Sequence, residues 1–198
     1  MEKKIKILAL FGKSASGKDN IQKWIINNCF KINGIVSCTT RPLRSGEQHG
    51  VDYFFLSDEE FTKKVLDGSM LEATSFREWF YGTTLDQLDP EKINVGVFNI
   101  AGIECLIEDP RLEVVPVWVH ATNKTRLIRS LNRETNPDCN EICRRYFTDE
   151  QDFADIDFEY FGWMNETKEQ QYYDYRMAQL LRILDSFCEP GQNPKNLI

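Results

Sequence analysis

A short loop near the N-terminus carries the residues best suited to chemistry. Gly12 and Gly17-Lys18 frame it, and Ser14, Ala15 and Ser16 lie between them. Glycines let the backbone turn its N–H groups towards an anion, and the lysine adds a mobile positive charge. The apolar run Ile5–Phe11 is typical of a buried parallel strand, and helical spacing follows Lys18. Strand, G-x-x-x-x-G-K and helix together predict a phosphate-binding loop for a nucleoside triphosphate.

Asp19 departs from the usual form of this motif. The residue after the lysine is normally a serine or threonine, whose hydroxyl binds Mg²⁺. A carboxylate is also a hard oxygen ligand, so Asp19 can hold the ion directly or through water. We therefore expect Asp19 to be a magnesium ligand; the alternative is a carboxylate that only caps the following helix.

A second group of candidate residues follows a strand predicted at 34–38. Arg41 and Arg44 lie three residues apart, and Pro42 stiffens the chain between them. Guanidinium groups bind phosphate oxygens through two parallel hydrogen bonds, so this pair suits a phosphorylated ligand. Tyr53, in the next predicted strand, adds a hydroxyl donor. The alternative is two solvent-facing arginines in an ordinary loop.

A third group consists of arginines on two predicted helices, at 123–133 and 141–153. Spacings of three and four place Arg126, Arg129 and Arg133 on one helix face, and Arg144-Arg145 lie on the second helix. Phosphoryl transfer spreads negative charge that the protein must neutralise. A helical pair carrying arginines is therefore typical of a lid that closes over a phosphate loop.

The loop after 34–38 also carries a long signature. It reads S-C-T-T-R-P-L-R-S-G-E-Q-H-G-V-D-Y-F-F from Ser37 to Phe55, and Met70-Leu71-Glu72 and Tyr81-Gly82-Thr83 follow. With the glycine-rich loop, this run resembles the guanylate kinase family, densely over 5–83 and more thinly over 95–147. The resemblance implies transfer of the γ-phosphoryl group of ATP to GMP or dGMP, with Mg²⁺ as cofactor.

The resemblance also implies the residues of both nucleotide sites. Those for the ATP phosphates are Gly12, Ser14, Ala15, Ser16, Gly17, Lys18 and Asp19. Those for the GMP phosphate are Arg41, Arg44, Tyr53 and Tyr81, and those for guanine are Ser37, Glu72 and Thr83. Glu72 can accept hydrogen bonds from the two adjacent donors of guanine, which adenine lacks. The catalytic set is Lys18, Arg129, Arg133 and Arg145, whereas Arg126 and Arg144 are expected to be solvated.

One segment departs from the family pattern. Asn99-Ile100-Ala101 stands where relatives carry two acids, as D-[IV]-D. We hypothesise that Asp19 restores the missing acidity near the metal. The departure leaves open a nucleoside monophosphate kinase with another base preference. It also leaves open a guanylate-kinase-like protein-binding module without catalysis, although Gly12, Gly17 and Lys18 are intact.

Strands that alternate with helices predict an α/β fold, with a P-loop NTPase-type parallel sheet flanked by helices. We expect a single domain over 1–198, built from a core (1–36, 89–121 and 151–198), an inserted GMP-binding lobe (37–88) and a helical lid (122–150). Ser57 should cap a helix that ends at Gly68, 158–161 should form the last strand, and 166–188 the last helix.

Composition narrows the class of protein further. The net charge of -7 argues against a nucleic-acid partner, because phosphate backbones need a basic surface. No apolar stretch is long enough for a signal peptide or a membrane span, so a cytoplasmic protein without membrane contact is expected. The 6 cysteines are scattered and are expected to be free thiols. A monomer and a homodimer both remain open.

Overall fold

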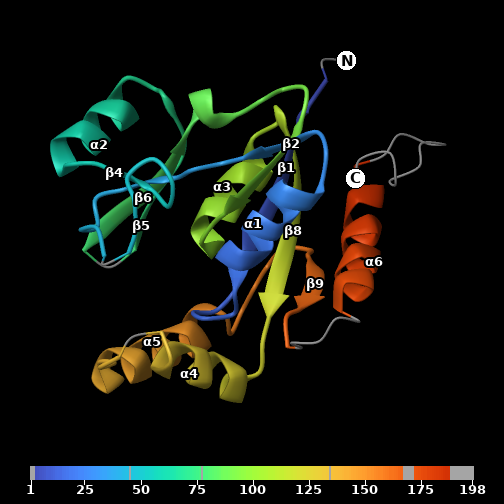
Figure 1. The fold of residues 1–198 in the computed structure, drawn as a ribbon. Helices are drawn as coiled ribbons and strands as arrows, with labels where there is room; N and C mark the ends of the chain where they lie inside the picture. The colour runs from blue at the N-terminus through green and yellow to red at the C-terminus, as the bar shows by residue number, and fades with distance from the viewer. Residues whose placement is uncertain (1–2, 45, 77, 134, 167–171, 188–198) are drawn as a thin grey trace. The chain divides into compact units, whose positions relative to one another are not determined.

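The computed structural model describes residues 3–44, 46–76, 78–133, 135–166 and 172–187. It contains a five-stranded sheet in the order β2-β7-β1-β8-β9 and a four-stranded sheet in the order β4-β3-β6-β5. The α/β prediction is confirmed, with a parallel central sheet flanked by helices (Figure 1). Contacts divide the chain into unit 1 (residues 1–9 and 31–114) and unit 2 (residues 10–30 and 115–198).

Unit 1 begins with most of β1 (Ile5–Phe11) and contains β2 (Ile32–Gly34), β7 (Ile93–Val97) and α3 (Ile100–Glu108). β2 and β7 are parallel, with Ile32 opposite Ile93. Asn94 is fully buried, and its amide donates to the carbonyl of Lys6 at 3.1 Å. The same side chain accepts from the N–H of Asp89 at 2.8 Å. Because this buried amide is hydrogen-bonded at both its nitrogen and its oxygen, it links β7 to β1 with little free-energy penalty for its burial.

The four-stranded sheet of unit 1 consists of β3 (Cys38–Thr39), β4 (Phe54–Phe55), β5 (Met70–Phe76) and β6 (Trp79–Thr84). β5 and β6 form an antiparallel hairpin, and a 3-10 turn, η1 (Leu85–Gln87), follows. α2 (Asp58–Leu66) begins with a capping box between Ser57 and Glu60, and Gly68 follows its end at φ 74°. Both predicted ends of this helix are confirmed, whereas β6 is a strand that the sequence pattern did not predict.

Unit 2 holds α1 (Lys18–Asn28), most of β8 (Leu112–His120), α4 (Asn123–Leu131), α5 (Cys139–Asp152), β9 (Phe161–Met164) and α6 (Tyr172–Asp185). The last strand was predicted at 158–161, but β9 begins only at Phe161, so the predicted position is three residues too early. Pairing with β8 begins only at Phe161, opposite Val117. Part of the predicted helix 166–188 lies outside the described residues.

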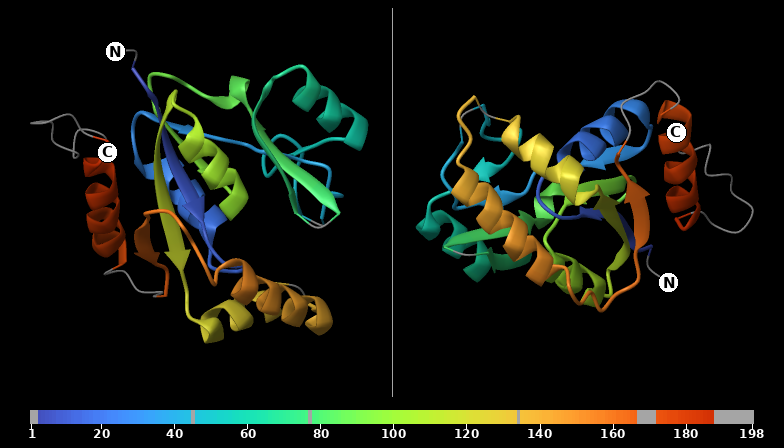
Figure 2. Two further views of the ribbon diagram at one scale, coloured as in Figure 1. Left: turned by 180° about the vertical axis from the view of Figure 1, so that it is seen from behind. Right: turned by 90° about the horizontal axis from the view of Figure 1, so that it is seen from below.

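In unit 2, several aromatic rings pack around Phe11. The ring of Phe11 contacts Trp118, Phe153, Phe158 and Tyr160, with centroids 5.5–6.1 Å apart. These contacts explain the misplaced strand, because the rings at 158 and 160 pack on Phe11 before ladder pairing begins. α6 lies alongside β9 (Figure 2). The buried side chains of α6 include Leu180 and Leu184.

Among the described residues, no helix has both the length and the apolar character that a membrane crossing needs. Five of the cysteines are free thiols, at positions 29, 38, 105, 139 and 143, as expected. Cys188 lies outside the described residues.

Candidate functional site

The loop after β1 in unit 2 is built around two glycines that no other residue could replace without displacement. A Cβ on Gly12 would overlap the backbone oxygen of Val119, and one on Gly17 would overlap the amide of Asn165. Gly17 also has φ 93° and stands at the start of α1. Ala15 adopts φ 59°, which is uncommon for a residue with a side chain. The loop is therefore held in a strained, tightly enclosed turn.

Lys18 lies folded against this loop. Its ammonium donates to the carbonyl of Gly12 at 2.8 Å and to that of Lys13 at 3.4 Å. Burial lowers its pKa from the ordinary value, and the negative charges of Asp19 and Asp149 oppose that shift. The two carboxylates therefore offset part of the effect of burial on the ammonium group.

Asp19 is exposed in the first turn of α1. Its carboxylate lies near enough to Lys18 to influence the lysine's pKa. An exposed oxygen ligand beside the lysine suits a Mg²⁺ ion that keeps several waters and binds phosphates as well. The residues present therefore fit the expected ion. The described residues hold no group of three or more acidic, cysteine or histidine side chains that would bind a metal by themselves.

The arginines of the predicted lid differ in their environments: Arg129 lies on α4, whereas Arg133 follows the C-cap of that helix at Asn132. Arg129 donates to the backbone oxygen of Ser16 at 3.0 Å and to that of Asn165 at 2.7 Å. Arg133 is exposed, and its charge acts on Lys18. On α5, Arg145 is half-buried and donates to Glu141 at 2.6 Å, while Arg144 is exposed as expected. Lys18 and Arg129 therefore both bond to carbonyls of the phosphate loop, and Arg133 lies near enough to Lys18 to influence the lysine's pKa.

Arg126 corrects the sequence prediction, which had placed it in solvent. Its side chain is 3% exposed and forms an ion pair with Asp149. Its Nε donates to the backbone oxygen of Ser14 at 3.0 Å. A buried guanidinium needs a charged partner, and the partner comes from the next helix, 23 residues away. Spacing along one helix could not reveal that partner.

Asp149 and Asn165 are site residues that the sequence analysis missed. Asp149 accepts from the N–H of Ser14 at 2.8 Å and from its hydroxyl at 3.1 Å. Asn165 is 4% exposed and donates to the backbone oxygen of Ser16 at 2.7 Å. One signal was available for Asp149, because it lies four residues after Arg145 and so shares its helix face.

In unit 1, the loop after β3 places Arg41 among aromatic rings. Its side chain is 4% exposed, lies 5.6 Å from the ring centroids of Tyr53 and Phe55, and donates to Glu47 at 2.8 Å. Burial would raise the pKa of Glu47, but hydrogen bonds from Arg41 and the N–H of Arg44 hold it below its usual range. Arg44 is itself exposed. The ring of Tyr81 lies 6.1 Å from that of Tyr53.

Glu72 on β5 is the buried carboxylate of unit 1. It is 7% exposed and stands opposite the fully buried Thr83 of β6. Burial raises the pKa of Glu72 to about 7, and a hydrogen bond with Thr83 acts against that shift. The hydroxyls of Thr83 and Ser37 are 3.2 Å apart. The three predicted guanine residues are therefore adjacent, with Thr83 between Glu72 and Ser37.

Asn99, which departs from the family pattern, has a structural role. Asn99 caps α3, accepting from the N–H of Gly102 at 2.7 Å and donating to Thr74 at 2.8 Å. A Cβ on Gly102 would lie 3.2 Å from a carboxylate oxygen of Glu72, so the first turn of α3 approaches that acid closely. Asn99 thus positions the start of a helix beside Glu72.

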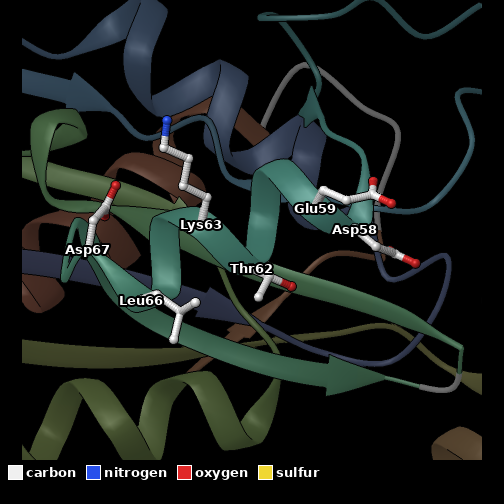
Figure 3. Close-up of a pocket in the computed structure, with 6 residues that line it drawn as sticks. All are labelled: Asp58, Glu59, Thr62, Lys63, Leu66 and Asp67. Atoms are coloured by element: carbon white, nitrogen blue, oxygen red, sulfur yellow. The ribbon is translucent and has the colours of Figure 1, made fainter.

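A separate hollow lies over α2, at the surface of unit 1 (Figure 3). The described residues that line it are Asp58, Glu59, Thr62, Lys63, Leu66 and Asp67. All of them come from α2 or its C-terminal end, and none is a predicted nucleotide-binding residue. The hollow is therefore no part of the candidate site.

Comparisons with known proteins identify the family of this chain. The family model described as guanylate kinase matches residues 4–174. The guanylate kinase of Rhodopirellula baltica is 32% identical over 148 residues, which are 70% of each chain. That of Campylobacter jejuni strain RM1221 is 26% identical over 193 residues, covering 94% of this chain and 92% of the relative.

A solved structure supports the fold. The crystal structure of guanylate kinase from Anaplasma phagocytophilum superposes with a TM-score of 0.63 at 20% identity, covering 91% of this chain and 86% of that chain. At that identity the likeness speaks for the fold alone. The match of the family model over most of the sequence goes further, and it shows that this chain belongs to the guanylate kinase family.

Proposed function

We propose that this chain transfers the γ-phosphoryl group of ATP to GMP or dGMP, giving ADP and the guanine nucleoside diphosphate. The observation that carries the proposal is the buried Glu72 beside the hydroxyls of Ser37 and Thr83. Guanine presents N1–H and an exocyclic amine side by side, and one ionised carboxylate accepts from both. Adenine would leave this buried acceptor unpaired, which is a large penalty.

Unit 2 carries the groups for the donor nucleotide. The loop amides between Gly12 and Lys18, together with the start of α1, supply N–H donors for the ATP phosphates. The ammonium of Lys18 leaves the loop carbonyls and follows the moving phosphoryl group. Arg129, Arg133 and Arg145 neutralise the charge that develops in the transition state.

Unit 1 carries the groups for the acceptor. Arg41, Arg44, Tyr53 and Tyr81 hold the phosphate of GMP, and Arg41 exchanges its bond with Glu47 for bonds to that phosphate. The acceptor oxygen is already an oxyanion, so no general base is required. Holding both reactants in line supplies most of the remaining rate enhancement.

Mg²⁺ bound with ATP would neutralise charge on the β- and γ-phosphates. Asp19 is the residue that we assign to it, as a direct ligand or through water. The usual motif has a hydroxyl at this position. The carboxylate of Asp19 would add negative charge near the metal, where the family pattern has the acids that Asn99 and Ala101 replace.

Replacing Asp19 by alanine should raise the Mg²⁺ concentration needed for half-maximal rate about tenfold, because one charged ligand is lost. The Mg²⁺-dependent increase in ATP affinity, measured by calorimetry without acceptor, should shrink in parallel. Asp58→Asn, which removes an exposed acid from the first turn of α2, is the matched control. An unchanged magnesium dependence in Asp19→Ala would refute the assignment.

The pKa of Glu72 predicts how GMP affinity depends on pH. Guanine requires the ionised carboxylate, and below about pH 7 the buried acid takes up a proton. Affinity for GMP should therefore fall about twentyfold between pH 7.5 and pH 5.5. Calorimetric titration at both values measures the change. Glu72→Gln reports the part that comes from the GMP phosphate itself, and equal dependence in both proteins would contradict the prediction.

The direct test of the function is ADP production from ATP and Mg²⁺, with GMP, dGMP, AMP, UMP and CMP offered separately. The proposal predicts fast turnover confined to GMP and dGMP. Turnover with another base would indicate that Asn99 and Ala101, which replace the two family acids, change the base preference. No turnover with any of the five would favour a binding module without catalysis.

A further inference from the structure

Asp149 closes a ring of bonds around one residue of the phosphate loop. Its carboxylate accepts from both the N–H and the hydroxyl of Ser14. Its ion-pair partner Arg126 donates to the carbonyl of the same serine. The loop is thereby bonded to α5 through the acid and to α4 through the arginine, and both bonding side chains are nearly fully buried.

The donors in this ring are of the kind that bind phosphate. A backbone N–H of the glycine-rich loop, a serine hydroxyl and a guanidinium are typical ligands of a phosphoryl group. The carboxylate also lies near enough to Lys18 to raise that lysine's pKa against the effect of burial. Asp149 thus occupies an anion site that a nucleoside triphosphate would need.

We propose that Asp149 is an internal anion: it fills the phosphate loop while no nucleotide is bound, and ATP must displace it. Displacement releases α5 from Ser14 and frees Arg126 to bond a phosphate oxygen. The residue therefore sets the affinity for ATP by competition. This inference rests on the proposed function, since it assumes that the loop receives a triphosphate.

The neighbouring Glu150 provides the contrast that isolates this role. It lies on the same helix, pairs with Lys13 at 2.7 Å and receives a bond from Arg126 at 3.3 Å. It accepts from side chains only, whereas Asp149 also accepts from a loop N–H. Removing either negative charge has a similar effect on the long-range electrostatic field. Only the replacement of Asp149 removes a carboxylate that is bonded to the N–H of the phosphate loop.

The experiment is calorimetric titration of ATP, without acceptor, into the full chain and into Asp149→Ala, Asp149→Asn and Glu150→Gln. Asp149→Ala should bind ATP about tenfold more tightly, the factor expected if the carboxylate fills the loop about nine-tenths of the time. Inorganic tripolyphosphate, which lacks base and sugar, should show the same gain. Glu150→Gln should stay within about twofold of the parent, because it leaves the loop occupied.

Asp149→Asn keeps the shape of the side chain and decides the matter if the alanine variant does not fold. It should also bind ATP more tightly, and thermal melting checks that it is folded. Affinity that is equal or weaker in the folded variants would overturn the inference and make Asp149 a positioning residue. Tighter ATP binding without phosphorylation of GMP would uphold the internal anion and refute the proposed function alone.

Discussion

Glu72→Gln lowers kcat/KM for GMP about a thousandfold, the loss expected when two charge-assisted hydrogen bonds to one buried group are removed. The glutamine offers one oxygen and one NH₂ group, and the latter meets an N–H of guanine as donor against donor. The NH₂ group of glutamine can donate to N1 of adenine, so the activity with AMP should rise relative to that with GMP. Initial rates with both nucleotides measure the effect.

The same substitution has an opposite effect on stability. The pKa of Glu72 is raised to about 7 in the folded chain, so folded protein binds more protons than unfolded protein between about pH 4.5 and pH 7. Its contribution to stability is therefore lost as pH rises through that window. At pH 8, Glu72→Gln should raise the free energy of unfolding by about 3 kcal/mol. Glu78→Gln, an exposed change in the β5–β6 turn, should alter neither property.

Lys18→Met lowers kcat about a thousandfold while leaving GMP affinity unchanged. The lysine is the mobile charge of the phosphate loop, and a transition state that loses one such group loses a large part of its stabilisation. Lys18→Arg should not restore the rate, because the planar guanidinium group of arginine replaces a compact ammonium group in an enclosed site. Single-turnover measurements with saturating ATP separate this effect from nucleotide binding.

Lys13→Met is the matched control for that prediction. It removes the same charge from the same loop, but the ammonium of Lys13 is bonded to Glu150 at 2.7 Å. We expect a rate within about threefold of the parent, because a partly exposed ion pair contributes little. Equal losses in both variants would mean that general positive charge in the loop, rather than the position of Lys18, accounts for the effect.

Local signals made much of the fold predictable. The cap at Ser57 and the glycine at 68 fix the ends of α2 through bonds within a few residues, and both were read from the sequence. The strand at 158–161 failed because its aromatic run is equally suited to ring packing on Phe11. β6 was missed since Gly82 interrupts its pattern, although this glycine lies where β5 leaves no room for a side chain.

The site was predictable where a motif is contiguous and not where two distant segments cooperate. The guanine residues Ser37, Glu72 and Thr83 were carried by a long signature, and the structure brings them together in unit 1. Arg126 was misplaced and Asp149 overlooked for one physical reason. Each is the ion-pair partner of the other, and the two lie on different helices, 23 residues apart.

The central claim is most directly tested by mixing the chain with ATP, Mg²⁺ and equimolar GMP and AMP, and following the products by phosphorus NMR. We expect GDP and ADP to appear in equal amounts from ATP and GMP while AMP remains unchanged. Consumption of AMP at a similar rate, or release of inorganic phosphate with GMP untouched, would contradict it.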